Sequence, residues 1–277
     1  ASPRGAGWCA GMHEVIDFII AKSPVALVLA VMVSTIAYIS SARWKTFVFS
    51  VPIPFTCAYL ATDIAINATH VAGLLLSSGY HWLIYLAVVR WRVPLAAAIP
   101  VGAMLYVATA SSLIYAAGVS PLGPIDVWPI GALLAVGIAY WLVMFRVFEP
   151  RHDGAHRSFA PWWVKGPLIY VLALVIYSLT GLLGGAVTTF PYAGVFTSYE
   201  MRKSLRTLAG QYSLNLIAFM AMLAAMWATE QYLLPEAWRH SAIFVGLPMS
   251  VGMLSLLYAV GLGRPLGEPP GDATQPA

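Results

Sequence analysis

Polar residues along this chain gather into short clusters, and the stretches between the clusters are long, uncharged and apolar. A helix needs about 20 apolar residues to cross a hydrocarbon core about 30 Å thick, so each stretch of roughly that length predicts a membrane-spanning helix. Nine such spans are predicted, at residues 23–41, 46–62, 68–89, 93–119, 127–145, 166–183, 185–199, 207–229 and 241–263.

The boundary between the sixth and seventh predicted spans depends on two adjacent glycines. The uncharged run from 166 to 199 has the length of two short crossings or of one long tilted element. Gly184 and Gly185 lie near its middle, and glycine readily adopts the backbone angles of tight turns. We therefore predict a turn at this pair.

Composition supports the membrane interpretation and excludes several other classes of protein. Hydrophobic residues make up 60% of the chain and charged residues only 9%, whereas a soluble domain is about 45–50% apolar and about 25% charged. A net charge of +4 is too small to track a phosphate backbone. The lipid bilayer is thus the expected partner, and a soluble domain, a disordered chain and a nucleic-acid binder are excluded.

Basic residues divide unevenly between the two sides of the membrane that nine spans create. Only Arg4, Lys22 and Arg239 fall on the side of the N-terminus. The other side carries Arg43, Lys45, Arg90, Arg92, Arg146, Arg151, Arg157, Lys165, Arg202, Lys203, Arg206 and Arg264. Because cytoplasmic loops are enriched in Lys and Arg, we predict a multi-pass protein of the inner (plasma) membrane, with its N-terminus outside and its C-terminus in the cytoplasm.

Two segments of the chain match each other at a constant separation of 137 residues. The matched pairs are Pro54 and Pro191, Tyr59 and Phe196, Asp63 and Glu200, and Ala72-Gly73 and Ala209-Gly210. The neighbouring spans follow in the same order, which predicts two four-span modules at residues 23–119 and 166–263. Residues 120–165 then hold a linker helix and a polar cytoplasmic loop.

The linker helix decides how the two modules are oriented. Four spans return the chain to its starting side, and the fifth span moves it across, so the second module enters from the opposite side. The predicted fold is therefore an all-α, polytopic transmembrane bundle with two inverted repeats. Many secondary transporters are built this way, with a site near the midplane where interrupted helices meet.

The two ends of the chain receive simpler assignments. Residues 1–22 are predicted to form an N-terminal tail and a short amphipathic helix, which begins at Met12. Residues 264–277 are rich in Pro and Gly and are predicted to be disordered.

A proline bend followed by an acidic residue occurs in both halves. The first half has Val-Pro-Ile-Pro-Phe at 51–55; the second has Thr-Phe-Pro-Tyr at 189–192, then Tyr-Glu-Met-Arg-Lys-Ser-Leu-Arg-Thr at 199–207. Each half thereby resembles the GlpM-like family of small four-span bacterial inner-membrane proteins, although the first half lacks the basic residues after its acid. The resemblance implies two such modules fused through a helix, and it brings no established catalytic or binding residues.

A second resemblance is more local. Ser-Leu-Arg-Thr at 204–207, Gly210 and the Ala/Met/Phe-rich span that follows are similar to a stretch in the A subunit of copper membrane monooxygenases. That likeness implies a metal-dependent membrane enzyme. No His/Asp/Glu cluster with metal-ligand spacing lies inside the predicted spans to support it.

The repeat confines the candidate functional residues to two equivalent segments. Asp63, Asn67 and His70 have i, i+4, i+7 spacing and are predicted to share one helical face. Glu200 and Ser204 hold the equivalent positions in the second half, with Arg206 beside them. Ionisable groups inside a bilayer are costly and are therefore functional candidates. A carboxylate at these positions can bind a cation or a proton, or can take part in a gate.

A structural role is the alternative for the same residues. Asp63 and Glu200 each lie where the next helix is predicted to start, so each carboxylate can cap free N–H groups. Glu200 can also pair with Lys203 three residues later. His70 and His81 lie three turns apart on one predicted helical face, where packing histidines compete with metal or haem ligands.

Pro54 and Pro191 complete the candidate site. Each proline interrupts the i→i−4 hydrogen bonds of its span, and in lipid the freed carbonyls need internal partners or a water-lined cavity. Such breaks are typical of discontinuous helices at a transport site, although proline kinks also serve packing alone.

The residues leave three functions open. The first is a secondary-transporter-like permease or small channel for an ion or small solute. The second is a non-catalytic accessory subunit that assembles with another membrane protein or with a second copy, and the third is a monooxygenase-like subunit. Because no catalytic motif occurs, no catalytic residue, metal site or cofactor is predicted, and an enzyme is disfavoured.

Overall fold

The computed structural model describes residues 4–38, 52–116, 127–147, 161–202 and 205–260, and every regular element in these ranges is helical. The α-helices are α1 (Arg4–Ala37), α3 (Ile53–Thr62), α4 (Ala68–Tyr85), α5 (Leu95–Ala116), α6 (Val127–Val147), α7 (Trp162–Ser178), α8 (Thr180–Leu183), α9 (Tyr192–Glu200), α10 (Leu205–Tyr232) and α11 (Ile243–Ala259). A π-helical turn, η1 (Leu86–Arg90), and two 3-10 helices, η2 (Gly184–Val187) and η3 (Glu236–Ala242), complete the set.

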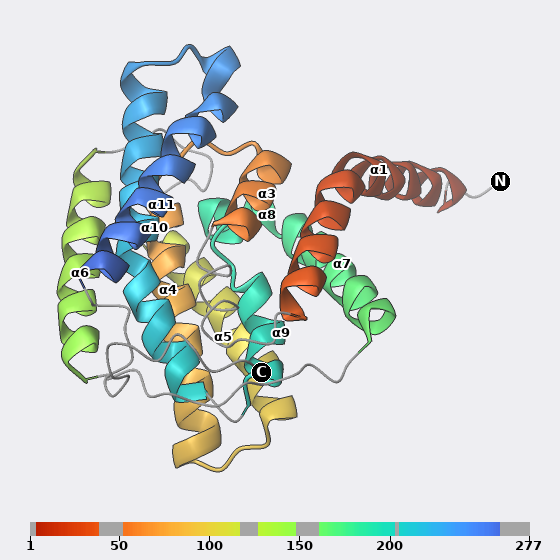
Figure 1. The fold of residues 1–277 in the computed structure, drawn as a ribbon. Coiled ribbons are helices and arrows are strands. Elements are labelled where there is room, and N and C mark those ends of the chain that lie inside the picture. The colour runs from red at the N-terminus through yellow and green to blue at the C-terminus, as the bar shows by residue number, and fades with distance from the viewer. Residues whose placement is uncertain (1–3, 39–51, 117–126, 148–160, 203–204, 261–277) are drawn as a thin grey trace.

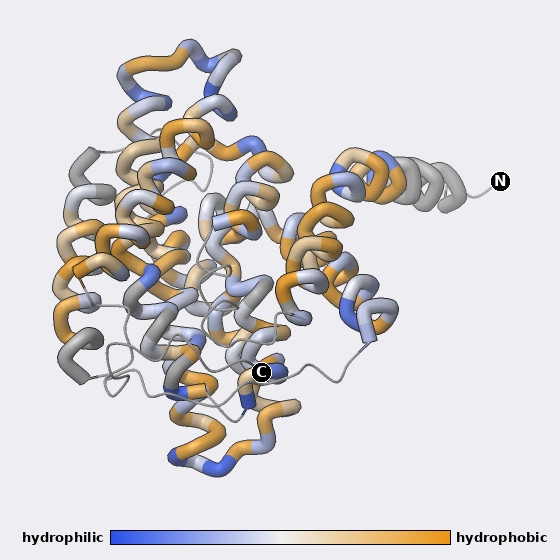
Figure 2. Tube along the Cα trace, viewed as in Figure 1, coloured by the Kyte–Doolittle hydropathy of each residue, from blue (hydrophilic) through white to orange (hydrophobic). Residues whose placement is uncertain are grey.

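Five helical segments in these ranges are long and apolar enough to cross a membrane. They are Glu14–Ile36, Ala68–Arg90, Leu95–Ala116, Leu208–Tyr232 and Trp238–Ala259. A sixth is obtained if Trp162–Ser178 and Thr180–Val187, which meet at a bend of 58°, form one broken span. Hydrophilic residues gather where α4 meets α5 and where α10 meets α11, at opposite ends of the bundle (Figure 2). These features support an all-helical, multi-pass membrane protein with five or six such helices.

The predicted spans 46–62 and 185–199 do not each appear as one long helix. The described part of the first contains only α3, whose ten residues measure about 15 Å. The second consists of η2, a non-helical stretch and the nine-residue α9, so the prediction of a single helix over 185–199 is wrong. Pro191 is the physical reason, because it cannot continue a helical hydrogen-bond ladder.

The turn predicted at the glycine pair is confirmed. Gly184 has φ 52° and ψ −136°, in a region that favours glycine, and it begins η2. The predicted amphipathic helix at the N-terminus and the first span are continuous in α1, which holds Pro24 internally. α1 bends along its length (Figure 1).

A similar order of helix lengths is found before and after α6. Long α1, short α3 and long α4 and α5 are followed by long α7, short α9 and long α10 and α11. α1 packs against α7, and α4 packs against α10. Within each of these pairs the two helices run in opposite directions (Figure 1). The bundle therefore brings helices from before α6 into contact with helices from after it.

Candidate functional site

The connection between α3 and α4 separates residues that the sequence places on one face. Asp63 ends α3 as its C-cap, with φ 55°, and residues 63–67 are not helical. The prediction that Asp63 shares a helical face with Asn67 and His70 is therefore wrong. Asp63 does not cap the following helix either, because Asn67 is the N-cap of α4.

Asn67 and His70 instead form a capping box at the start of α4. The Asn67 N–H donates to His70 Nδ1 at 3.2 Å, and the Asn67 side chain accepts from the Thr69 N–H at 3.0 Å. The Thr69 hydroxyl also donates to Asn67 Oδ1 at 2.6 Å and accepts from the Gly185 N–H at 2.7 Å. Residues 184–191, which comprise η2 and the non-helical stretch before α9, are named the broken segment. This chain of hydrogen bonds connects the start of α4 to that segment.

Hydroxyl groups bond the carbonyls of η2, directly before the non-helical stretch that leads to α9. The Tyr106 hydroxyl donates to the Ala186 carbonyl at 2.8 Å, and the Tyr192 hydroxyl donates to the Val187 carbonyl at 3.0 Å. Thr188 donates to the Gly185 carbonyl at 2.7 Å. Since no water is present in a bilayer core to solvate such groups, these bonds allow the backbone to remain broken there.

A glycine on α4 allows this segment to come close. A Cβ atom at Gly73 would lie 2.2 Å from Thr189 Oγ1 and 2.7 Å from the Ala186 Cα. Those distances are far below van der Waals contact, so a larger residue at position 73 would push η2 away from α4. Gly73 belongs to one of the dipeptides that the repeat matches.

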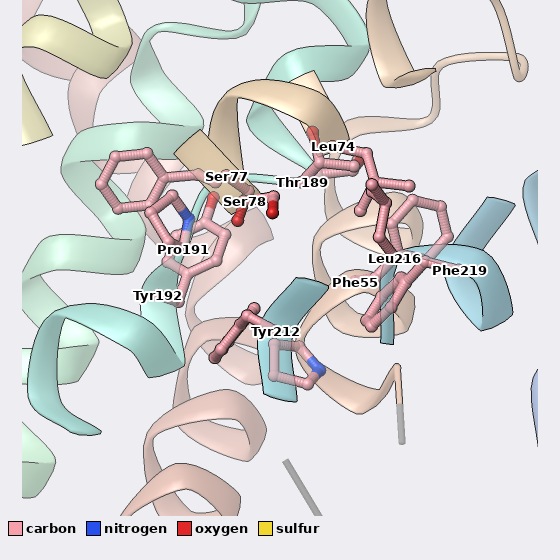
Figure 3. Close-up of a pocket in the computed structure, with 13 residues that line it drawn as sticks. Phe55, Leu74, Ser77, Ser78, Thr189, Pro191, Tyr192, Tyr212, Leu216 and Phe219 are labelled. Carbon is pink, nitrogen blue, oxygen red and sulfur yellow. The ribbon is translucent and has the colours of Figure 1, made fainter. Parts of the chain in front are cut away.

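A small cavity lies where the broken segment, α3, α4 and α10 meet (Figure 3). It has a volume of about 50 Å³, enough for about three or four water molecules. Its lining residues are Pro54, Phe55, Leu74, Ser77, Ser78, Thr188, Thr189, Phe190, Pro191, Tyr192, Tyr212, Leu216 and Phe219. Both candidate prolines thus line the same cavity, although they are far apart in the chain.

His81 contacts two of the residues that line this cavity, Ser77 and Tyr212. Its Nδ1 donates to the Ser77 carbonyl at 2.7 Å, and its ring stacks on that of Tyr212 with centroids 3.4 Å apart. A Cβ atom at Gly194, in the first turn of α9, would lie 2.2 Å from His81 Nε2. The histidine therefore packs tightly between α4, α9 and α10.

A polar cluster, which we name the Asp63 cluster, joins the α3–α4 connection to the end of α10 and to η3. Arg239 donates to the Asp63 carboxylate and, at 3.1 Å, to its carbonyl; His240 Nε2 lies 3.0 Å from the same carboxylate. Glu230 accepts hydrogen bonds from the Tyr59 hydroxyl and from the Ile66 N–H. The Asp63 side chain is 59% exposed, so this cluster is partly open to its surroundings.

Glu200 forms a buried ion pair at the other end of the bundle. Glu200 is the last residue of α9, and its carboxylate bonds to the Lys165 ammonium group of α7. The two side chains are 4% and 5% exposed. The Lys165 ammonium also lies over the Tyr38 ring, 4.7 Å from the centroid. α10 begins at Leu205, and residues 203–204 before it lie outside the described residues, so the predicted capping by Glu200 is not tested.

The remaining site predictions have mixed outcomes. Lys203 and Ser204 lie outside the described residues, so neither the predicted Glu200–Lys203 pair nor the role of Ser204 is tested. Arg206 lies in the first turn of α10, half-buried, and its Nε has no hydrogen-bond partner in the described part of the chain. Arg206 does not line the cavity.

Sequence reasoning missed Arg239, Glu230 and His240 of the Asp63 cluster and Lys165 of the buried ion pair with Glu200. Lys165 and Arg239 were considered only as loop charges, and Glu230 lies one residue beyond the end of the predicted span 207–229. His240 follows Arg239 directly. The signal available for Glu230 was an acid at the edge of an apolar run.

Comparison with known protein families, curated proteins and solved structures finds no match for this chain. The resemblance to GlpM-like modules therefore stays a prediction. Within the described ranges no three His, Cys, Asp or Glu side chains gather in a way that could hold a metal ion. Function is accordingly inferred from the geometry of the chain itself.

Proposed function

We propose that this protein is a secondary-transporter-like permease built from two inverted repeats. The observation that carries the proposal is the relation between α3 and α9. Each is a short helix with proline at its start, both starts line one cavity, and each helix ends at an acidic residue bound to a base. Discontinuous helices that meet near the midplane are the usual form of a transport site.

The positions of the helices in the chain support the repeat. Moved by 137 residues, Ala68 at the start of α4 falls on Leu205 at the start of α10. The same shift moves Asp63, after the last residue of α3, onto Glu200 at the end of α9. The opposite directions of α1 and α7, and of α4 and α10, support an inverted relation (Figure 1).

A topology of nine passes follows if the two interrupted spans and α6 each cross once. The 21 residues of α6 measure about 31 Å, which matches a hydrocarbon core. We place the α4–α5 connection, with Arg90 and Arg92, in the cytoplasm, in accord with the positive-inside rule. The Asp63 cluster then faces the outside of the inner membrane, and the N-terminus lies on that outer side.

The Asp63 cluster and the buried Glu200–Lys165 pair act as gates in this proposal. Opening the cytoplasmic side requires the Glu200–Lys165 pair to separate, and solvent screens this buried contact less than an exposed one. The Asp63–Arg239 contact is far more exposed, so it opposes opening less strongly, by about 0–1 kcal/mol. The protein thus favours a state in which the cytoplasmic side is closed and the central cavity is small.

Flux measurements on the purified protein in liposomes test this function. We expect ion or solute flux above that of protein-free liposomes, and Glu200→Gln should change the rate severalfold because it weakens the cytoplasmic gate. Glu236→Gln, at an exposed position of η3, is the matched control and should leave the rate unchanged. Absence of flux across a broad panel of ions, protons and small solutes would overturn the proposal.

A different result would favour an accessory subunit. In that case Asp63→Asn and Glu200→Gln would both be functionally silent, and the protein would co-purify with a stable membrane partner.

A further inference from the structure

The central cavity lies at the N-terminal ends of two helices. Pro54 and Phe55 belong to the first turn of α3, and Pro191 and Tyr192 are the N-cap and first residue of α9. Pro54 and Pro191 have no N–H group, and the Tyr192 N–H donates to the Phe190 carbonyl at 2.7 Å. The potential at these ends therefore comes from the aligned peptide dipoles, which place a partial positive charge of about half a unit there. Two such ends therefore give the cavity a positive potential.

The side chains around the cavity do not offset this potential. Of the described residues that line it, none is charged, so no carboxylate is present to attract a cation. The charged groups Asp63 and Glu200 lie at the opposite, C-terminal ends of α3 and α9. A cation would meet two positive helix ends and no compensating anion.

A hydroxyl group that has no partner also faces the cavity. The Ser77 side chain is 6% exposed, its hydroxyl forms no hydrogen bond within the described part of the chain, and it points into the cavity (Figure 3). Thr188 and Thr189 differ, because their hydroxyls donate to backbone carbonyls at 2.7 and 3.3 Å. The Ser77 hydroxyl can therefore donate a hydrogen bond to a group bound in the cavity.

From these observations we propose that the cavity binds a small monovalent anion, such as a halide ion or the carboxylate of a one- or two-carbon acid. This inference rests on the proposed transport function and names its substrate class. The helix ends supply positive potential, Ser77 supplies a hydrogen bond, and a volume of about 50 Å³ suits a small ion.

Changes in liposome volume, followed by light scattering, distinguish the classes of substrate. Liposomes containing the full chain are given gradients of potassium chloride or potassium formate in the presence of valinomycin. Glycerol and urea serve as neutral probes, and potassium gluconate with a proton carrier reports cation flux. We expect chloride, formate or both to permeate, and only when valinomycin carries the countercharge.

Paired substitutions at position 77 test the electrostatic argument. Ser77→Asp places a negative charge in the cavity, whereas Ser77→Asn has nearly the same shape without the charge, so anion flux should be about tenfold lower or more in the Asp variant. If the Asp variant does not fold, Ser77→Val is compared with Ser255→Val, which lies on an exposed face of α11. Only Ser77→Val should reduce anion flux by about tenfold.

Each result has a defined meaning. Flux of cations or neutral solutes without anions overturns the anion site and leaves a permease standing. Equal anion flux in the Asp and Asn variants also overturns the anion site, as does unchanged flux in Ser77→Val. No flux of any probe overturns both the anion site and the transport function.

Discussion

The buried pair between Glu200 and Lys165 allows a quantitative test of the packing between α9 and α7. Both side chains are almost fully buried, so removing one partner leaves the other as an uncompensated charge in a low-dielectric interior. We expect Lys165→Met to lower the free energy of unfolding by about 3–5 kcal/mol. Part of this loss comes from the contact of Lys165 with the Tyr38 ring, worth about 0.5–2 kcal/mol.

A double-mutant cycle separates the pair from these other contacts. Glu200→Leu alone should also be strongly destabilising, whereas the double variant with Lys165→Met should recover most of the loss, because both charges are then absent. Denaturant titration in detergent micelles, followed by tryptophan fluorescence, gives the four free energies. A coupling energy of about 2 kcal/mol or more is expected. Additive effects of the two substitutions would refute a direct buried pair.

The Asp63–Arg239 contact provides the matched comparison. Because the Asp63 side chain is 59% exposed, solvent screens the pair, and Asp63→Asn should change stability by only about 0–1 kcal/mol. A loss as large as that of Lys165→Met would show that exposure does not govern the strength of these two contacts.

Two further predictions concern the close approach at α4 and the topology. Gly73→Ala should destabilise the protein by about 1–3 kcal/mol, because the added Cβ would clash with Thr189. Gly79→Ala on the same helix has open space around it, so in the same titration it should stabilise the protein by about 0.5–1 kcal/mol. On a cysteine-free background, Trp91→Cys should react with an impermeant thiol reagent only from the cytoplasmic side and Trp238→Cys only from outside; labelling of both from one side would contradict the proposed orientation.

Much of the helical architecture was predictable because a bilayer restricts what a chain can do. Long apolar runs must form helices there, and Gly184 indicated the turn that the structure contains. The prolines at positions 54 and 191 indicated where helices are interrupted, and the structure places both beside one cavity.

The rest depended on contacts that a sequence does not display. Regular spacing from Asp63 to His70 suggested one helical face, but the backbone leaves the helix at Asp63 and starts again after Asn67. Lys165 lies in a polar segment and is 35 positions from Glu200, so its pairing follows only from the packing of α7 against α9.

The hydrogen bonds of the broken segment have a consequence for biogenesis. The backbone around Gly185 and Ala186 depends on Thr69 and Tyr106, which are synthesised 116 and 80 residues earlier, respectively. A chain that emerges from its N-terminus inserts these partners into the membrane before the segment that needs them. The first half therefore serves as a template on which the second half can leave its helical path. Expressed alone, residues 161–260 would expose unsatisfied backbone groups to lipid, which favours their capture by quality control rather than stable insertion.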